Sequence, residues 1–482
     1  MKQHTGDRAP LLRRPRPLHL ALRRRLHRAL ALGALVAGPL LLGAVLAAQA
    51  PAQPAPAPTP GGDLPAQGGE ATAVIEGDIR AQLRLAMPQL TFRPGLTAAG
   101  QRAARELETA LREDLERSGV FIVQGPEELA VLRLTGDAAR DYELYRSLGN
   151  EILLLGDVYE EGGRLVLEGR VYDLKSGQSI LGKRYRGGYE LARRMAHSFA
   201  DEIILYFTAR RGISLTSIAF TSDRSGNKEI HLMDYDGRNQ RAVTGHKSIS
   251  LAPDWSPTGD AIAYVSFFDG NPGLYLVDLA SGTKRPIVAD GSTNLAPSFS
   301  PDGRRVVFSR SLSGNNEIFV ANRDGSGQRR LTHSAGIDTN PAWSPVGTMV
   351  AYTSSRAGNP HIYLIDVEGT NDRRVSFEGN YNDGAAWSPD GKRLAYASRR
   401  RGNQFDIVIT DLALLDTKVV TRGLAGSHEA PTWSPDGRLI AFESTSGGRT
   451  QIRVIPADGG TAELITAEGN NFAPDWSSYP AP

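Results

Sequence analysis

Short apolar runs separated by polar turns repeat along the second half of the chain. Within residues 429–466, four such runs follow one another, at 430–433, 438–442, 451–455 and 461–466. Runs of this length with turn residues between them are typical of antiparallel β-strands. The Ser-Pro-Asp-Gly sequence between the first two runs reverses the chain tightly, because proline presets φ and glycine accepts a positive φ. The pattern therefore predicts a four-stranded antiparallel unit.

This unit recurs six times. An aromatic residue followed by serine marks each copy, at Trp255, Phe299, Trp343, Trp387, Trp433 and Trp476. The steps between these aromatic residues are 44, 44, 44, 46 and 43 residues. Four short strands at this period are typical of the blades of a β-propeller. The aromatic ring supplies a large apolar body that can fill the space between neighbouring blades.

The two ends of the repeat region predict how the propeller closes. The first copy, from Ile213, begins at the second strand of a blade, whereas residues 470–478 supply a first strand and then stop. Together they make one blade, so we expect a six-bladed propeller closed by a strand from the C-terminus. Such a ring has no free sheet edge.

The region before the repeats, residues 72–212, mixes helical and strand periods. Leu107, Leu111 and Leu115 lie on one stripe of a helix predicted at 98–117. Further predicted elements are strands at 120–123, 152–159, 164–173 and 179–185 and helices near 141–148 and 189–208. The fold class is therefore multidomain, a small N-terminal α/β domain at 72–212 followed by an all-β propeller at 213–482.

The first 71 residues carry an export signal and a linker. A basic start precedes the apolar run 29–48, and Ala48-Gln49-Ala50 matches a cleavage site, so we expect a signal peptide over 1–50 that is cleaved near Ala50. An uncleaved anchor is the alternative, because 20 apolar residues can just span a bilayer. Residues 51–71 form a Pro/Ala-rich linker. The chain has no cysteine, so neither a disulfide nor a cysteine-borne lipid is expected.

Charge gives no support for nucleic-acid binding. The chain carries 55 basic and 53 acidic residues, but without residues 1–50 it carries 46 basic and 52 acidic ones. A slightly acidic mature protein does not favour binding to a polyanion. We expect a monomer in the periplasm.

The repeats and the region joining them to the α/β domain resemble a known family. The WSPDG-type motifs, together with residues 201–224 (DEIILYFTARRGISLTSIAFTSDR), are similar to the TolB family of the Tol-Pal cell-envelope system. This resemblance covers residues 72–482. It implies a non-enzymatic scaffold without cofactors that binds a peptidoglycan-associated lipoprotein at one mouth of the propeller channel. It also implies contact with inner-membrane Tol proteins through the segment before the α/β domain, and a role in envelope integrity and cell division.

The resemblance further implies which loops hold the lipoprotein. They are the segments that lead into the first strand of each blade, one to four residues before the proline. The matching residues are Ser250, Leu251, Asn294, Leu295, Asp338, Thr339, Asn340, Asn382, Asp383, His428, Glu429, Asn470, Asn471 and Phe472. Ordinary polar loop residues are the alternative interpretation of this set. One copy departs from the pattern, with Gly384-Ala385 where the others have a residue followed by proline.

Enzymatic functions are the alternative class. A serine hydrolase needs a G-x-S-x-G turn, which the sequence lacks. His246, His333 and His428 stand in loops of alternating blades and could converge on a transition metal, as in a metal-dependent propeller lyase. They lie at different distances from their prolines, which places the three rings at different heights. A sugar- or peptide-processing propeller thus stays the second hypothesis beside the scaffold.

Overall fold

The computed structural model describes residues 82–245, 247–312 and 314–480. The predicted signal peptide and linker, and His246, lie outside these ranges. No helix within them is both long and apolar enough to cross a membrane.

A mixed sheet forms the core of the α/β domain, with strand order β3-β1-β4-β5-β6. Its strands are β1 (Leu83–Ala86), β2 (Thr91–Phe92), β3 (Phe121–Gln124), β4 (Ile152–Glu161), β5 (Arg164–Asp173) and β6 (Gln178–Gly187). β1 pairs in parallel with β3 and β4, β2 pairs in parallel with β4, and β4, β5 and β6 form an antiparallel meander. The four strands predicted here from the sequence are confirmed within two residues at each end.

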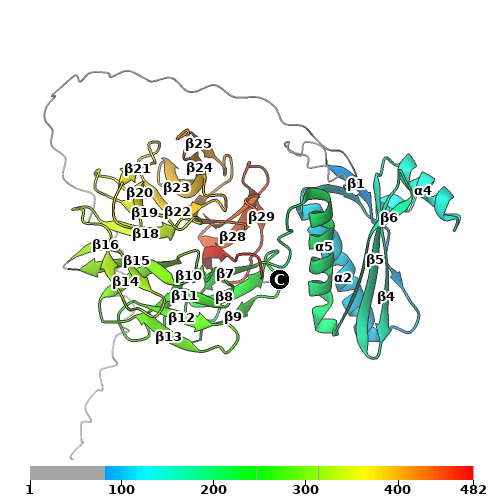
Figure 1. Ribbon diagram of the computed structural model, residues 1–482, viewed down its shortest axis with the longest axis horizontal. Coiled ribbons are helices and arrows are strands. Elements are labelled where there is room, and N and C mark those ends of the chain that lie inside the picture. Colours follow the sequence, from blue (N-terminus) through cyan, green and yellow to red (C-terminus); the bar gives the residue numbers. More distant parts are fainter. Residues whose placement is uncertain (1–81, 246, 313, 481–482) are drawn as a thin grey trace, which may run out of the picture. The chain divides into compact units, whose positions relative to one another are not determined.

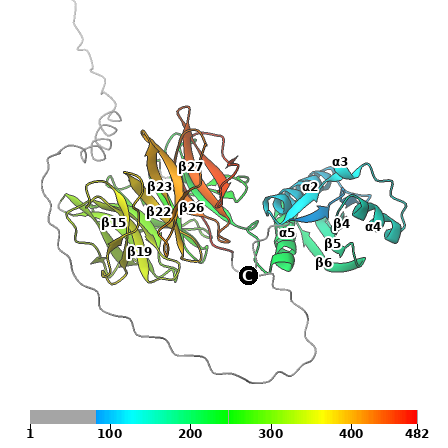
Figure 2. The same cartoon turned by 90° about the horizontal axis from the view of Figure 1, so that it is seen from above.

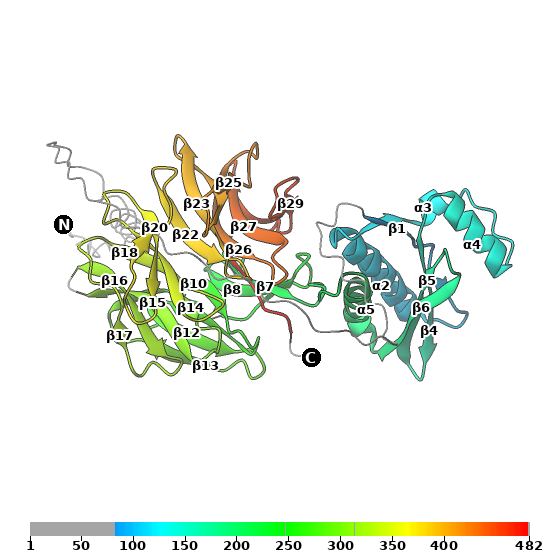
Figure 3. The same cartoon turned by 45° about the horizontal axis from the view of Figure 1, so that its top comes forward.

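Helices cover both faces of this sheet. They are α2 (Ala98–Arg117), α3 (Pro126–Leu129), α4 (Ala138–Ser147) and α5 (Ala192–Thr208), with a 3₁₀ turn at Tyr189–Leu191 before α5. α2 and α5 lie side by side on one face (Figures 1 and 3), where their apolar stripes pack on alternate strand residues such as Leu85 and Leu154. Ala86 and Leu153, one residue along, point to the other face and contact Leu129 of α3 and Tyr145 of α4.

Six four-stranded antiparallel sheets follow in the described part of the chain, and they form the predicted propeller. The three blades next in sequence are β10–β13 (Ser250–Trp255, Ala261–Ser266, Gly273–Asp278, Lys284–Val288), β14–β17 (Thr293–Phe299, Arg305–Leu312, Asn315–Asn322, Arg329–Arg330) and β18–β21 (Asp338–Trp343, Met349–Ser354, His361–Asp366, Arg373–Arg374). Two more are β22–β25 (Asn382–Trp387, Arg393–Arg401, Gln404–Asp411, Thr417–Val419) and β26–β29 (Ser427–Trp433, Leu439–Ser446, Arg449–Pro456, Glu463–Leu464). The second strands β15, β19, β23 and β27 follow one another around the ring (Figure 2).

The sixth blade joins the two ends of the propeller sequence, as predicted. β30 (Asn471–Trp476) pairs with β7 (Ser217–Ser222), which continues to β8 (Glu229–Asp234) and β9 (Arg241–Ala242). The predicted role of the aromatic residues is also observed. Trp433, for example, packs between Ile407 of one blade and Ile440 of the next, and it is 5% exposed.

A bulge interrupts the first strand of every blade. In each blade the register of pairing with the second strand shifts after the residue that lies four positions before the aromatic. In the first strand β10, for example, the shift lies between Leu251 and Asp254. The next residue is left-handed in all six blades, at Ala252, Ala296, Asn340, Gly384, Ala430 and Ala473, with φ between 45° and 65°. This explains the departure at Gly384, where glycine adopts the required φ without strain.

We expect Gly384→Ala to lower the free energy of unfolding by about 1 kcal/mol, because a Cβ in the left-handed region is strained. Added bulk is not the cause, since the new Cβ meets no atom within 4 Å. The reverse change, Ala430→Gly, removes the same strain and is expected to be neutral or slightly stabilising. Urea denaturation followed by tryptophan fluorescence measures both. Equal destabilisation by the two changes would contradict the strain argument.

Candidate functional site

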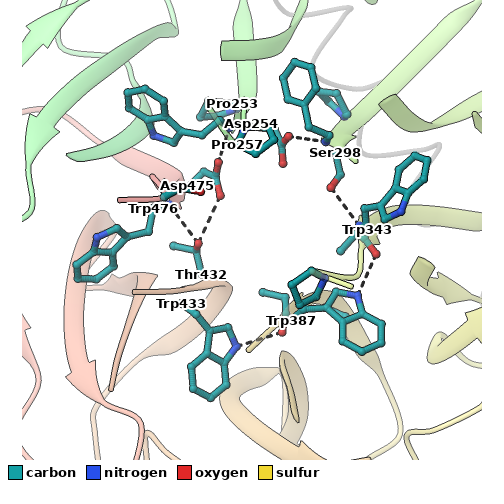
Figure 4. A pocket seen from close by; sticks show the side chains of 18 of the residues that line it. Pro253, Asp254, Pro257, Ser298, Trp343, Trp387, Thr432, Trp433, Asp475 and Trp476 are labelled. Carbon is teal, nitrogen blue, oxygen red and sulfur yellow. Dashed lines mark hydrogen bonds between the residues drawn. The ribbon is translucent and has the colours of Figure 1, made fainter. Parts of the chain in front are cut away.

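The first strands of the six blades enclose a central channel. A cavity of about 610 Å³ runs along it, from the left-handed residues such as Ala252 and Ala430 to the prolines of the SPDG turns such as Pro301. Figure 4 shows the ring of side chains that surrounds its middle. The residue immediately before each aromatic contributes to this ring, at Asp254, Ser298, Ala342, Ala386, Thr432 and Asp475.

Each of these residues links its blade to the next one. Four do so with their side chains, which accept a hydrogen bond from the backbone N–H of the next aromatic: Asp254 from Phe299 (2.7 Å), Ser298 from Trp343 (3.2 Å), Thr432 from Trp476 (3.1 Å) and Asp475 from Trp255 (2.6 Å). At the two alanines the indole replaces the side-chain bond. Trp387 and Trp433 donate their Nε1–H to the carbonyls of Ala342 and Ala386, at 3.0 and 3.1 Å. A hydrogen bond thus crosses every blade junction around the channel.

Among the residues that the structure describes, Asp254 and Asp475 are the only carboxylates that line this cavity. Burial raises the pKa of Asp475 to about 7. Burial, together with the neighbouring Asp475 carboxylate, raises the pKa of Asp254 well above its ordinary value. The two side chains belong to neighbouring strands, β30 and β10, so their charges repel each other across the junction that closes the ring. Sequence analysis missed this pair because aspartate alternates with serine, threonine and alanine at this position of the repeat.

The predicted partner-binding residues divide into two structural groups. In each blade, the residue that lies five positions before the aromatic is completely buried, at 0% exposure. These residues are Ser250, Asn294, Asp338, Asn382, His428 and Asn471. The other eight are partly exposed: Leu251, Leu295, Thr339, Asn340, Asp383, Glu429, Asn470 and Phe472. The structure therefore brings the second group, but not the first, to the surface.

The buried group links strands beneath the loops. Ser250 and Thr244 both donate to the Glu229 carboxylate, and Asn471 donates to Gln451 at 2.9 Å, which also accepts from Thr466 at 2.7 Å. Because buried polar groups need partners, these two clusters fix where β10 and β30 begin. They support the exposed residues from below.

We call the partly exposed residues four positions before the aromatics, with the left-handed residues that follow them, the channel mouth. The first of each pair is Leu251, Leu295, Thr339, Asp383, Glu429 or Phe472. Asp383 is held in place by three neutral donors: Asn340 Nδ2 (2.8 Å), Thr353 Oγ1 (2.7 Å) and the Gly384 N–H (2.8 Å). Burial raises the pKa of Glu429. Glu443, its cross-strand neighbour, has its pKa raised to about 7 by burial and accepts from the Ala473 N–H at 2.8 Å.

The three histidines proposed as metal ligands gain no support from the described residues. His428 is buried against the ring of Phe442, with centroids 5.5 Å apart, whereas His333 is exposed. His246 lies outside the described residues. Within the described ranges, no three histidine, cysteine, aspartate or glutamate side chains are grouped to hold a metal ion.

Comparison with known proteins matches both parts of the chain. The model of the TolB beta propeller domain matches residues 206–480, and that of the TolB amino-terminal domain matches residues 71–180. The Tol-Pal system protein TolB of Geobacter metallireducens is 38% identical over 159 residues, which cover 33% of this chain and 37% of that protein. The TolB of Syntrophotalea carbinolica is 39% identical over 164 residues, covering 32% and 37%. These matches thus span little more than a third of the length of the curated relatives.

A solved structure extends the similarity over most of the chain. The crystal structure of TolB from Acinetobacter baumannii aligns with a TM-score of 0.70 at 26% identity, covering 83% of this chain and 97% of that one. The propeller match alone spans more than half of the 482 residues. The chain therefore belongs to the TolB family.

Proposed function

We propose that this protein is the TolB component of a Tol-Pal system, a periplasmic scaffold without catalytic activity that binds a peptidoglycan-associated lipoprotein at the channel mouth. Its contribution to envelope integrity and cell division would follow from that binding. The observation that carries the proposal is the channel mouth itself, where seven predicted contact residues surround the end of a closed ring. The relatives named Tol-Pal system protein TolB support the assignment to this system. Contact with inner-membrane Tol proteins through the segment before the α/β domain, cleavage near Ala50 and a monomeric state are part of the same proposal.

The mouth is suited to binding because its backbone is rigid. Bulged strands, left-handed residues and the buried polar clusters beneath them fix the loops before a partner arrives, which reduces the entropy lost on association. A ring of side chains on a preformed scaffold is the usual arrangement for recognition by a propeller.

We expect the double change Thr339→Arg and Glu429→Arg to abolish capture of the lipoprotein from detergent-solubilised envelope. Two bulky cations at partly exposed positions, on the two blades that flank the blade of Asp383, obstruct the mouth and reverse one of its charges. The measurement is affinity capture with the mature protein, followed by mass spectrometry and by the dissociation constant of the purified lipoprotein.

The matched control is Glu368→Arg with Asp458→Arg, which changes the net charge at least as much. Both carboxylates are exposed, at 76% and 96% of their side-chain surface, and both lie in turns between third and fourth strands, at the end of the blade opposite the mouth. Capture by this variant should equal that of the parent. If the mouth variant still captures the lipoprotein, the proposed binding face is wrong.

A further inference from the structure

The channel mouth has two chemically different halves. Going around the ring, the first residues of the mouth are Phe472, Leu251 and Leu295 on three consecutive blades, and then Thr339, Asp383 and Glu429 on the next three. The apolar and polar residues are therefore not mixed. Each type occupies a continuous arc of three neighbouring blades.

The apolar half extends outward from the rim. Leu251 and Leu295 pack with Phe267 on the core of the blades beneath them, and all three stay partly exposed. Ile249 and Phe268, in the loops beside Leu251, are 37% and 57% exposed. The Lys228 ammonium lies 3.9 Å from the centre of the Phe472 ring, at the edge of this half. Exposed apolar side chains gathered around a depression are typical of a binding surface.

Two buried hydroxyls beneath the apolar half lack hydrogen-bond partners. Thr221 is the cross-strand neighbour of Phe472, and Ser309 is that of Leu295. Their side chains are 0% and 1% exposed, and neither hydroxyl is hydrogen-bonded within the described residues. The equivalent residues of two other blades, Thr353 and Glu443, bond to groups of the mouth. The hydroxyls of Thr221 and Ser309 are buried, so the apolar half offers a partner no polar group from these two positions, in contrast to the other half.

The other half carries carboxylates. Asp383 and Glu429 are on adjacent blades, and Glu443 is the cross-strand neighbour of Glu429. Their hydrogen bonds come from neutral donors only, and within the described residues none of the three carboxylates forms an ion pair. Lys228 is the cation that lowers the pKa of Glu443, but it stacks on Phe472. A cationic group of a partner would therefore find two carboxylates, Asp383 and Glu429, that form no ion pair within the described residues.

We propose, on the basis of the protein-binding function proposed above, that the mouth selects an amphipathic cationic segment of its partner. Such a segment places an aliphatic or aromatic side chain on Phe472, Leu251 and Leu295, and a lysine or arginine beside Asp383 and Glu429. The apolar contact supplies affinity, and the charge pairing sets the orientation and excludes acidic segments.

An array of capped synthetic pentapeptides, probed with the labelled full chain, tests this selectivity. In each peptide one position is leucine, phenylalanine or serine, and a second is lysine, arginine, glutamine or glutamate, at every spacing. We expect leucine–lysine and phenylalanine–arginine peptides to bind at least 10-fold better than their glutamate counterparts, with a preference that weakens as salt is added. Replacing leucine by serine should also reduce binding.

Variants of the acidic half provide the decisive comparison. Asp383→Lys with Glu429→Lys should invert the preference, so that glutamate peptides bind better than lysine peptides. Because this change could disturb the loops, Glu429→Gln serves as a conservative second variant, and it should reduce the lysine preference several-fold while leaving the leucine preference intact. Glu368→Lys with Asp458→Lys, remote from the mouth, should change neither.

The outcomes separate this inference from the function on which it rests. This inference is wrong, and the proposed function stands, if the lipoprotein is captured through the mouth but the array shows no charge preference. The same conclusion follows if the array shows a charge preference that is unchanged in the variants of the acidic half. If the preference is present and inverts as expected but no lipoprotein is captured, the selectivity stands and the identity of the proposed partner is wrong.

Discussion

We expect Gly325→Ala to lower the free energy of unfolding of the propeller by about 2–4 kcal/mol. Gly325 lies in the turn between the third and fourth strands of its blade, at φ +87°, and a Cβ built there comes within 1.8 Å of the carbonyl oxygen of Ile287 in the preceding blade. Two penalties add: strain of the left-handed residue, about 1 kcal/mol, and separation of two packed blades, about 1–3 kcal/mol.

Three other blades supply matched controls with the same backbone conformation. Gly237, Gly369 and Gly459 occupy equivalent turns at φ 86°, 85° and 85°, but their Cβ atoms would lie 2.2, 3.3 and 3.5 Å from the facing carbonyl oxygens. We therefore expect destabilisation to fall in the order Gly325, Gly237, Gly369, Gly459 on substitution by alanine, down to about 1 kcal/mol for strain alone.

Urea denaturation followed by tryptophan fluorescence is a suitable measurement, because all five tryptophans of the chain lie in the propeller. The signal therefore reports this domain and not the α/β domain. Four equal losses of stability would show that blade spacing at these turns is not tight, and would contradict the argument.

These glycines illustrate what the sequence could and could not predict. For Gly237, Gly325 and Gly459 the turn role follows from the local sequence, because Asp-Gly pairs between apolar runs indicate hairpin turns. The close approach of a neighbouring blade does not follow, since it depends on the distance between sheets. The propeller as a whole shows the same division. The repeat pattern and its two ends predicted the blade count and the closing strand correctly. The hydrogen bonds from Asp254 and Asp475 to the next blade are evident only from the geometry of the ring.

The sequence locates the loops of the candidate site, but it does not predict which of their residues are exposed. Counting back from the proline placed all fourteen residues near the mouth, but the count cannot tell which side of a strand a residue faces once a bulge shifts the register. As a result Asn382 and Asn471 are buried, whereas Asp383 and Phe472, one residue further along, are at the surface. Bulges are hard to predict from sequence when alanine, not glycine, adopts the left-handed conformation.

We expect Asp475→Asn to raise the free energy of unfolding at pH 8 by roughly 2 kcal/mol. The asparagine amide oxygen can still accept the Trp255 N–H across the closing junction, and the change removes the charge that repels Asp254. Raising a carboxyl pKa from about 4 to about 7 corresponds to roughly 4 kcal/mol, and relaxation of the channel reduces that figure.

The sign of the pH dependence distinguishes this explanation from a packing effect. The folded pKa of Asp475 is above its unfolded value, so the folded protein binds the extra proton, and the parent loses stability as the pH rises from about 4 to about 7. The Asp475→Asn variant should lack this part of the pH dependence and should differ little from the parent near pH 4.

Asp302→Asn is the control of opposite sign. Hydrogen bonds from the Ser300 hydroxyl and from the Arg304 N–H lower the pKa of Asp302, so its carboxylate stabilises the fold above about pH 4. If Asp475→Asn destabilises the propeller equally at pH 5 and pH 8, the carboxylate is a favourable link in its charged form, and repulsion between Asp254 and Asp475 does not limit the stability of the ring.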